Sequence, residues 1–355
     1  MFIWYSFVKL LLFSWEVCSL ATLDDIAQEL GLSKGTVSKA LNGAKDISKK
    51  TQQAVLEKAI ELGYTRIARS SNAPRIAVFV INMEYTNADD FGFDIITGFR
   101  QVAEPAGFQV DVIALTTQIQ TDYRYDEYMM RHNYVGAAFL GMCLLDPWLK
   151  EFASCKTPTV LYDNDSGSNA NVSSVAVNNA EGIELAVKYL RSLGHQKIGY
   201  LSSALESYVY QQRYDAFIQV MKQQGLPADK TVMGNSYQVS KCVTDHLPRL
   251  LKNGCTAIIC SHDVLAHSAI VHCFELGVRV PRDVSIVGFD DIPLCRFTTP
   301  ALTTIRQNRI ALGKSAFFAL QGHLHGVPTC SFLLHAELVE RSSCSPFTAK
   351  EATTV

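Results

Sequence analysis

The sequence predicts an α/β protein in which a small all-α domain precedes two doubly wound parallel-sheet lobes. Three short helical patterns, separated by turn signals, lie between residues 22 and 63. From residue 76 onward, nearly continuous apolar runs alternate with amphipathic segments of helix length. That alternation is typical of parallel sheets covered by helices on both faces. A length of 355 residues accommodates both parts.

The chain divides into five expected segments: an extension at 1–20, a helical domain (the head) at 21–65, a shortened linker at 66–75, a two-lobed domain (the body) at 76–345 and a tail at 346–355. The extension is hydrophobic like an export signal, but Lys9 and Glu16 interrupt it and no small-x-small cleavage motif follows. One interpretation is a start codon assigned too far upstream, with translation beginning at Val17 or Leu20. The other is a genuine amphipathic or membrane-associated extension.

Charge is distributed unevenly between the head and the body. Residues 21–75 carry nine Lys and Arg against six Asp and Glu, a net charge of +3, so the body is net acidic in a chain of −2. A basic head is compatible with nucleic acid as a partner. The ten cysteines include no C-x-x-C pair, which indicates reduced thiols in the cytoplasm. His262, His267 and His272 turn by about 140° from one to the next on a helix, so we expect no metal site.

The head begins with two short helices. Residues 22–30 place apolar side chains at helical spacing, with Thr22 as the N-cap and Asp25 three residues later. Gly31 ends this helix, and Ser33 caps a second one that runs to Asn42. Two helices of about eight residues across a three-residue turn containing Gly predict a helix-turn-helix.

A third helix starts at Ser48 and ends at Gly63, a residue suited to the left-handed C′ position. The outward face of the second helix is polar or minimal, carrying Lys34, Gly35, Ser38, Lys39 and Asn42. Such a face docks in the major groove of DNA, where Lys donates to guanine. Charge and periodicity alone leave open that it is only a solvated face.

The run from Ala21 to Tyr64, with its V-S-K-A-L-N stretch and closing L-G-Y, resembles the head of the lactose/galactose repressor family. The resemblance implies double-stranded operator DNA as a partner. It also implies base contacts by Lys34, Gly35 and Lys39, with Asn42 and Ser48 nearer the phosphates. The full set of expected DNA-contacting residues is Thr22, Ser33, Lys34, Gly35, Thr36, Ser38, Lys39, Asn42 and Ser48.

The linker departs from the family pattern. Members usually follow the closing Tyr with Pro-Asn and a hinge helix whose Leu wedges into the minor groove. Here Tyr64 precedes a shorter segment, TRIARSSNAPR, in which the Ala68-Arg69 pair persists but Ser70 and Ser71 occupy the place of the wedge. The sequence therefore predicts dimeric major-groove binding and leaves minor-groove kinking open.

The body contains nine apolar runs that we expect to be strands. They are Ile76–Ile81, Gln109–Ala114, Gly136–Leu140, Thr159–Tyr162, Val175–Val177, Lys197–Leu201, Ala257–Cys260, Ser285–Phe289 and Thr303–Ile305. Ligands of such sheets bind beyond the carboxyl ends of the strands. The polar and aromatic residues expected there are Asp89, Phe91, Phe93, Asp163, Asp263, Asp290 and Asp291, with Arg213 opening a later helix.

Carboxylates, a guanidinium and nearby rings are the groups that hold a polyol, through forked hydrogen bonds to its hydroxyls and stacking on its apolar face. The alternative for any single aspartate is that it caps the next helix. Blocks such as RVPRDVSIVGFDDIPLCRFTTPALTTIRQN resemble the family's periplasmic-binding-protein-like core, so the resemblance extends to Ser343.

By that resemblance Arg213 and Asp290 are effector ligands, and Asp163 and Tyr237 are their neighbours. The family commonly has Asn-Asp where this chain has His262-Asp263, a departure that bears on the chemistry of the pocket. The expected effector-contacting residues are Phe91, Phe93, Asp163, Arg213, Tyr237, Asp263 and Asp290.

The resemblance implies a cytoplasmic, homodimeric repressor whose operator affinity responds to a small molecule, a sugar or sugar derivative. No phosphate-binding loop, nucleophile elbow, H-E-x-x-H or dinucleotide fingerprint is present in the sequence, so we expect no enzyme and no cofactor. Two alternatives stay open. The hydrophobic start and the body would suit an exported or membrane-anchored sugar-binding protein, and a regulator of this architecture can answer to a protein corepressor instead.

Overall fold

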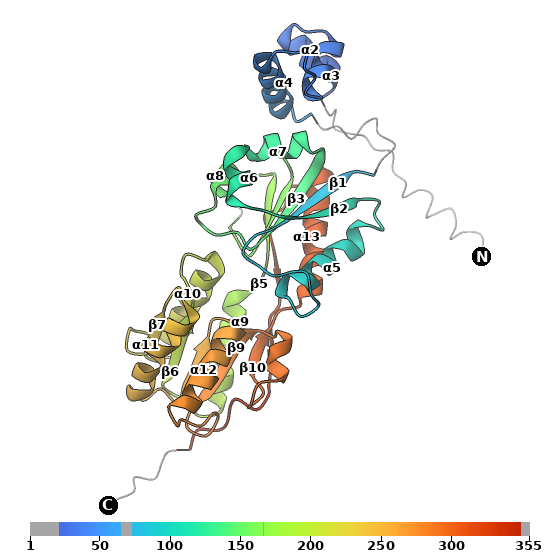
Figure 1. Cartoon of the computed structure of the whole chain (residues 1–355). Coiled ribbons are helices and arrows are strands. Elements are labelled where there is room, and N and C mark those ends of the chain that lie inside the picture. Colours follow the sequence, from blue (N-terminus) through green and yellow to red (C-terminus); the bar gives the residue numbers. More distant parts are fainter. Residues whose placement is uncertain (1–20, 65–72, 166, 349–355) are drawn as a thin grey trace, which may run out of the picture.

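A computed structural model describes residues 21–64, 73–165 and 167–348. It contains a helical head followed by two α/β lobes, with the last described residues at the far end of the second lobe (Figure 1). The predicted extension and most of the predicted linker, including Ser70 and Ser71, lie outside the described residues. Within the described part of the chain, no helix combines the length and apolar character needed to cross a membrane.

The head consists of α2 (Leu23–Leu30), α3 (Lys34–Leu41) and α4 (Lys49–Glu61). The capping box predicted at its start is confirmed, because Thr22 and Asp25 exchange side-chain and backbone hydrogen bonds. Gly31 has φ 64°, a left-handed conformation that glycine adopts without steric cost and that turns the chain into α3. Ile26, Val37 and Val55, one from each helix, are fully buried and form the small core.

The N-terminal lobe is built on one six-stranded sheet in the order β11-β5-β4-β3-β1-β2, and every pairing in it is parallel. Its strands are β1 (Arg75–Val80), β2 (Gln109–Ala114), β3 (Tyr134–Leu140), β4 (Thr159–Tyr162), β5 (Val172–Val177) and β11 (Ser331–Leu334). Its helices are α5 (Phe91–Ala103), α6 (Thr117–Asp122), α7 (Tyr125–Arg131), α8 (Pro147–Glu151) and α13 (Arg309–Leu324).

Alternate residues of β1 face opposite cores of this lobe, as the period of two along a strand requires. Ile76 and Val78 pack with side chains of α5 and α13, and Phe79 packs with aromatic side chains of α7 and α8. Helices α5 and α13 lie in backbone contact, because a Cβ on Gly98 or Gly313 would lie about 2 Å from a carbonyl oxygen of the other helix.

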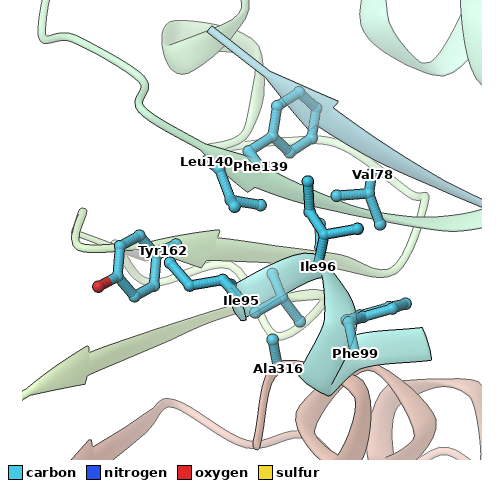
Figure 2. Close-up of a pocket in the computed structure, with 10 residues that line it drawn as sticks. Val78, Ile95, Ile96, Phe99, Phe139, Leu140, Tyr162 and Ala316 are labelled. Carbon is cyan, nitrogen blue, oxygen red and sulfur yellow. The ribbon is translucent and has the colours of Figure 1, made fainter. Parts of the chain in front are cut away.

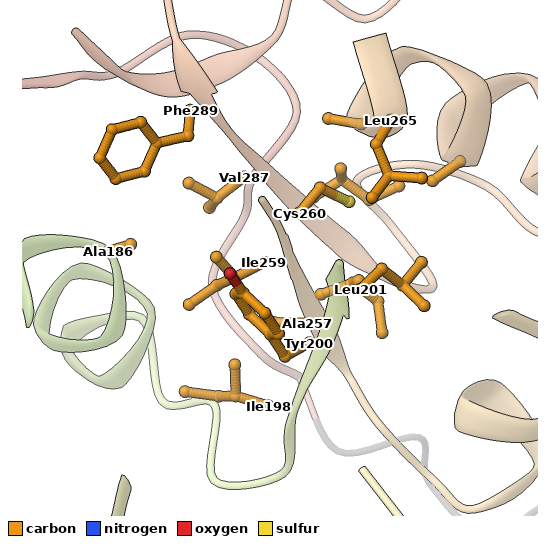
Figure 3. Packing of buried hydrophobic residues seen from close by; sticks show 14 of the residues in the cluster. Ala186, Ile198, Tyr200, Leu201, Ala257, Ile259, Cys260, Leu265, Val287 and Phe289 are labelled. Atoms are coloured by element: carbon orange, nitrogen blue, oxygen red, sulfur yellow. The ribbon is translucent and has the colours of Figure 1, made fainter. Parts of the chain in front are cut away.

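The C-terminal lobe has a second six-stranded sheet, in the order β12-β10-β9-β8-β6-β7. Its strands are β6 (Ile198–Ser202), β7 (Met233–Asn235), β8 (Ala257–Cys260), β9 (Ser285–Asp290), β10 (Thr303–Arg306) and β12 (Glu337–Val339). Its helices are α9 (Asn179–Ser192), α10 (Tyr208–Gln223), α11 (Val239–Lys252), α12 (Asp263–Glu275) and the 3₁₀ turn η2 (Pro293–Arg296). Figure 3 shows the apolar side chains of β6, β8 and β9 packed in its core.

All nine predicted strands are confirmed, most of them to within one or two residues at each end. The short strands β7, β11 and β12 were not predicted. The predicted parallel sheets are confirmed, with one antiparallel addition at an edge, where β12 pairs with β10. The reason is topological: the chain crosses between the lobes after β5, after β10 and after β11, and the last crossing is too short to bring β12 in parallel.

Candidate functional site

The polar face of α3 is exposed as the sequence predicts, except at Ser38, which is half-buried. Lys34, Gly35, Lys39 and the C-cap Asn42 are exposed, whereas Val37 is fully buried against the other head helices. A basic, sterically open helix face on a small domain matches the geometry of a recognition helix.

Both lysines of this face lie beside carboxylates. The Lys34 ammonium is 2.5 Å from an Asp24 oxygen, and the Lys39 ammonium is 2.6 Å from an Asp46 oxygen. The lysine side chains remain about half exposed, so solvent screens each pair and it contributes little to stability. Pairs this weak leave the ammonium groups available to a competing phosphate or base.

Three of the predicted DNA-contacting residues are helix N-caps. The hydroxyls of Thr22, Ser33 and Ser48 accept hydrogen bonds from backbone N–H groups of α2, α3 and α4. The Ser33 hydroxyl is also within 2.9 Å of the Thr36 hydroxyl. These residues therefore orient the N-terminal turns, where unpaired N–H groups and the helix dipole favour an anion such as a DNA phosphate.

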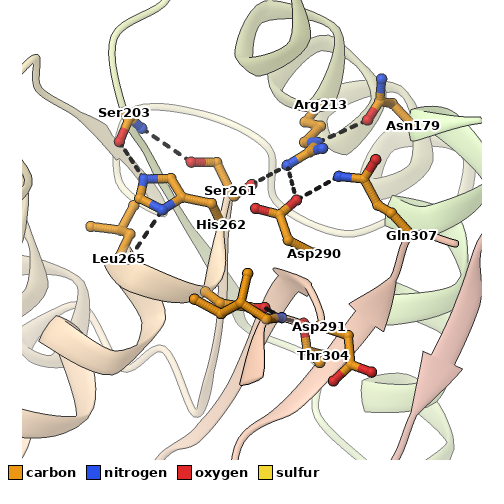
Figure 4. A network of polar contacts seen from close by, with 12 residues as sticks. Asn179, Ser203, Arg213, Ser261, His262, Leu265, Asp290, Asp291, Thr304 and Gln307 are labelled. Carbon is orange, nitrogen blue, oxygen red and sulfur yellow. Dashed lines mark hydrogen bonds and ion pairs between the residues drawn. The ribbon is translucent and has the colours of Figure 1, made fainter. Parts of the chain in front are cut away.

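In the body, Arg213 of α10 is the centre of a polar network that joins several strand ends (Figure 4). Its side chain is 2% exposed. Its Nε donates to the Asn179 Oδ1 (2.8 Å), and its Nη1 donates to the Ser261 carbonyl (2.6 Å) and to an Asp290 oxygen (3.2 Å). The guanidinium also lies 3.7 Å from the centroid of the Phe289 ring. Arg213 belongs to the second turn of α10 rather than to its first residue, where the sequence placed it.

The network continues from Asp290 to the N-terminal lobe. The Gln307 amide donates to the Asp290 carboxylate (2.6 Å), and the Tyr162 hydroxyl at the end of β4 donates to the Gln307 carbonyl (3.1 Å). Burial raises the pKa of Asp290, while Arg213 and Gln307 favour its charged form. Polar groups from both lobes are thus connected through one carboxylate.

Asp163 follows β4 and has an unusual environment. Its φ of 50° is left-handed, and its Oδ1 is buried without a hydrogen-bond partner. Burial raises its pKa to about 7, although the Arg213 charge opposes that shift. An unpaired buried oxygen costs free energy, and a ligand hydroxyl that donated to it would remove this cost.

Of the two phenylalanines predicted for the site, the structure brings Phe91 to the network and places Phe93 elsewhere. Phe91 opens α5, and its ring centroid is 6.5 Å from that of Tyr162. Phe93 is two residues further on, which rotates its side chain by about 200° around the helix. Of these two phenylalanines, Phe91 is the one whose ring lies beside the polar network.

Asp263 and Tyr237 are not part of this network. The Asp263 oxygens accept hydrogen bonds from the Thr304 hydroxyl (2.5 Å) and the Ile292 N–H (3.0 Å), which ties α12 to the neighbouring strand and turn. Tyr237 follows the edge strand β7 and is 83% exposed. Asp263 therefore holds elements of the C-terminal lobe together, and Tyr237 lies on the surface beside the edge strand.

His262, rather than Asp263, is the N-cap of α12. Its Nδ1 accepts from the Leu265 N–H (3.3 Å), so its Nε2 carries the proton and donates to the Ser203 hydroxyl (2.7 Å). Burial and the nearby Arg213 charge lower its pKa to about 4, which keeps the ring neutral. The Tyr210 ring lies 5.4 Å away, centroid to centroid.

Sequence reasoning missed Gln307, Tyr162, Asn179 and Tyr210 as members of this cluster. Gln307 could have been found, because it comes just after a predicted strand and the same rule identified Asp290. The same rule would have found Asn179, which comes two residues after the predicted strand ending at Val177, whereas no strand end marks Tyr210 in the first turn of α10.

The N-terminal lobe also contains a small gap between α5 and its sheet (Figure 2). It is lined by apolar groups such as Ile96, Phe99 and Val160, and the Tyr162 hydroxyl points away from it. A gap without polar partners does not hold water or a polar ligand, so it belongs to the core. Among the described residues, no cluster of His, Cys, Asp or Glu is arranged to hold a metal ion.

Comparison with known proteins identifies both parts of the chain. The model of the bacterial regulatory proteins of the lacI family matches residues 22–66, and that of the periplasmic binding protein-like domain matches residues 187–344. The HTH-type transcriptional regulator MalR of Streptomyces coelicolor is 30% identical over 336 residues, which cover 90% of this chain and 96% of MalR.

Two solved structures have the same fold. A complex of the transcriptional regulator CelR with cellobiose aligns with 91% of this chain and 99% of its own, at 23% identity and a TM-score of 0.66. A lac repressor dimer bound to operator and the anti-inducer ONPF aligns with 92% of this chain and 100% of its own, at 23% identity and a TM-score of 0.62. The chain belongs to the lacI family of bacterial regulatory proteins and is a DNA-binding transcriptional regulator controlled by a small-molecule effector.

Proposed function

We propose that this regulator is a cytoplasmic, homodimeric repressor that binds a double-stranded operator and responds to a sugar bound between its lobes. The expected DNA contacts come from the exposed face of α3, with Lys34 and Lys39 donating to base edges or phosphates. The capped N-termini of the head helices support phosphate contacts beside them. The operator complex of the structurally similar lac repressor dimer supports this arrangement.

A polyhydroxyl effector suits the chemistry between the lobes. Arg213, Asp290 and Gln307 offer donors and acceptors in fixed positions, and the unpaired oxygen of Asp163 is an additional acceptor. Phe91 supplies an aromatic face for the apolar side of a sugar ring. The cellobiose complex of the structurally similar CelR supports the same ligand class.

A second copy of the chain suits the outer face of α12. Val264, Val271 and Phe274 recur on one side of this helix, and Phe297 ends η2, which packs against α12. All four are exposed, and Phe274 and Phe297 are about 80% exposed. Exposed large apolar side chains along one helix face mark a protein interface. A symmetric dimer through it would set the spacing of the two recognition helices.

The observation that best supports effector binding between the lobes is the buried Arg213–Asp290 pair, which Gln307 connects to the N-terminal lobe. An effector that contacts this pair and Asp163 would stabilise one relative orientation of the lobes. Since the heads are joined to the N-terminal lobes, that orientation would alter the fit to the two half-sites of an operator.

The test is titration calorimetry of the full chain with a panel of mono- and disaccharides, repeated on Arg213→Ala, Asp290→Ala and Asp163→Asn. We expect each substitution to abolish or strongly weaken sugar binding. Removing one partner of a buried pair destabilises a fold, so Asp163→Asn, which keeps the pair intact, serves as the variant whose folding is secure. Wild-type affinity in Asp163→Asn and Asp290→Ala, or no binding of any sugar to the wild type, would contradict the proposal.

A further inference from the structure

Arg309, the first residue of α13, contacts both lobes at once. Its Nη1 donates to the carbonyl oxygens of Asp290 (3.2 Å) and Asp291 (3.3 Å), which form the turn after β9 in the C-terminal lobe. Its Nε and Nη2 lie 3.1 and 3.0 Å from an Asp94 oxygen on α5 of the N-terminal lobe. The same guanidinium is 5.5 Å from the centroid of the Phe91 ring. One side chain, 12% exposed, therefore joins the turn after β9 in the C-terminal lobe to α5 in the N-terminal lobe.

The turn that Arg309 contacts is conformationally strained. Asp290 and Asp291 are consecutive non-glycine residues with φ 117° and 53°, and such conformations persist only when surrounding contacts fix them. The Asp291 carboxylate is held by Arg306 and Arg341 at 2.7 Å each, both from the C-terminal lobe. Arg309 connects the backbone of this turn directly to the Asp94 carboxylate on α5.

On the N-terminal side, α5 is packed so closely against α13 that a displacement of its first turn must move both helices. Its backbone touches α13 at Gly98 and Gly313, where no space for a Cβ exists. Close-packed helices shift as rigid bodies rather than deform. The N-terminal halves of α5 and α13 therefore move together. Arg309, the first residue of α13, is where this pair of helices contacts the Asp290–Asp291 turn.

We propose that Arg309 is the positioning residue that couples the Asp290–Asp291 turn to α5, so that occupancy of the cleft at Asp290 changes the position of the N-terminal lobe. The alternative is that Arg309 only stabilises the start of α13. The role of this coupling in regulation rests on the proposed effector site. The contacts of Arg309 themselves are present in the ligand-free protein, so the coupling can be measured without an effector.

The experiment is hydrogen-exchange mass spectrometry of the ligand-free full chain in a double-mutant cycle of Arg309→Gln and Asp94→Asn. Asp94 lies on α5 and contacts the turn only through Arg309. We expect Asp94→Asn to accelerate amide exchange severalfold at residues 287–292, in the opposite lobe, as well as in the first turn of α5. In the Arg309→Gln background, Asp94→Asn should add nothing at 287–292.

Two further variants separate coupling from general destabilisation. Arg309→Lys keeps the charge but loses the fork that contacts two carbonyls and a carboxylate together, so we expect it to uncouple the lobes like Arg309→Gln. Arg306→Gln removes a partner of Asp291 from within the C-terminal lobe. Because coupling is reciprocal, we expect faster exchange at the turn and in the first turn of α5 while Arg309 is present, and at the turn alone in the Arg309→Gln background.

The inference is overturned if Asp94→Asn changes exchange only within α5, or if its effect at 287–292 persists in the Arg309→Gln background. A failure of sugar binding would instead contradict the proposed effector site and leave this link untouched. The two failures are therefore distinguishable.

Discussion

At the scale of single residues, the head and the body use charge differently. The lysines of α3 are exposed and weakly paired, so they remain free to exchange a carboxylate for DNA. Arg213 and Asp290 are buried and paired, so a ligand that replaced one partner would change the stability of the arrangement around them. The exposed lysines therefore suit reversible binding, whereas the buried pair suits a change between two conformations.

We predict that Lys39→Ala weakens binding to a selected operator duplex by about 1–3 kcal/mol and leaves sugar affinity unchanged, because Lys39 lies on the exposed face of α3. Fluorescence anisotropy against the selected duplex and against random DNA measures the effect. Lys58→Ala, on α4 of the same head, removes the same charge and is the control. An equal loss on both duplexes would make Lys39 a phosphate contact instead.

Asp163 gives the ligand-free protein a pH-dependent stability. Because its pKa rises from 3.8 to about 7 on folding, the folded state holds a proton that the unfolded state releases as pH rises from 4 to 7. Stability from this group therefore falls as pH rises through that window. We predict that Asp163→Asn, which cannot ionise, gains in Tm relative to wild type between pH 5 and pH 8. A Tm difference that stays constant with pH would contradict the buried environment of Asp163.

At the scale of elements, the helices and strands that could be predicted from the sequence are those with a regular pattern of apolar residues. The head helices follow from apolar spacing and the caps Thr22, Ser33 and Ser48, and long strands such as β1 follow from continuous apolar runs. Strand β7 is the three residues Met-Gly-Asn, and β11 alternates exposed and half-buried side chains, so neither has such a signal.

The candidate site was predicted in part for a related reason. Strand ends mark Asp163 and Asp290, because the carboxyl ends of parallel strands meet at one edge. The local pattern of residues does not determine the order of strands in a sheet. The sequence therefore could not show that Tyr237 follows an edge strand and is exposed. The dual contact of Arg309 depends on the packing of two lobes and has no local signal at all.

The contact between α5 and α13 provides a test at the same scale. A Cβ on Gly313 would lie 1.9 Å from the Ile95 carbonyl oxygen, so Gly313→Ala must separate the two helices. We predict a loss of about 1–3 kcal/mol in the free energy of unfolding, measured by urea denaturation. Gly322→Ala, on the same helix but with 3.4 Å of space, is the control and should be neutral or stabilising. Equal effects of the two substitutions would contradict the close packing.

At the scale of the whole molecule, the outer face of α12 determines the proposed assembly. We predict that Phe274→Asp converts the dimer to a monomer in sedimentation velocity, because it places a charge in the centre of an apolar interface. Leu145→Asp is the matched control, since Leu145 is equally exposed but lies on a loop of the N-terminal lobe. Dimers that persist in Phe274→Asp would locate the interface elsewhere.

One chain carries both the DNA-binding head and the proposed effector site, and one measurement tests whether the two are coupled. A duplex selected from random DNA by the wild-type protein is titrated with the full chain, with and without each sugar that binds in calorimetry. We predict that at least one such sugar changes operator affinity about tenfold or more, and that Asp163→Asn removes the change while keeping operator binding. A sugar that saturates the protein and leaves operator affinity unaltered would contradict it.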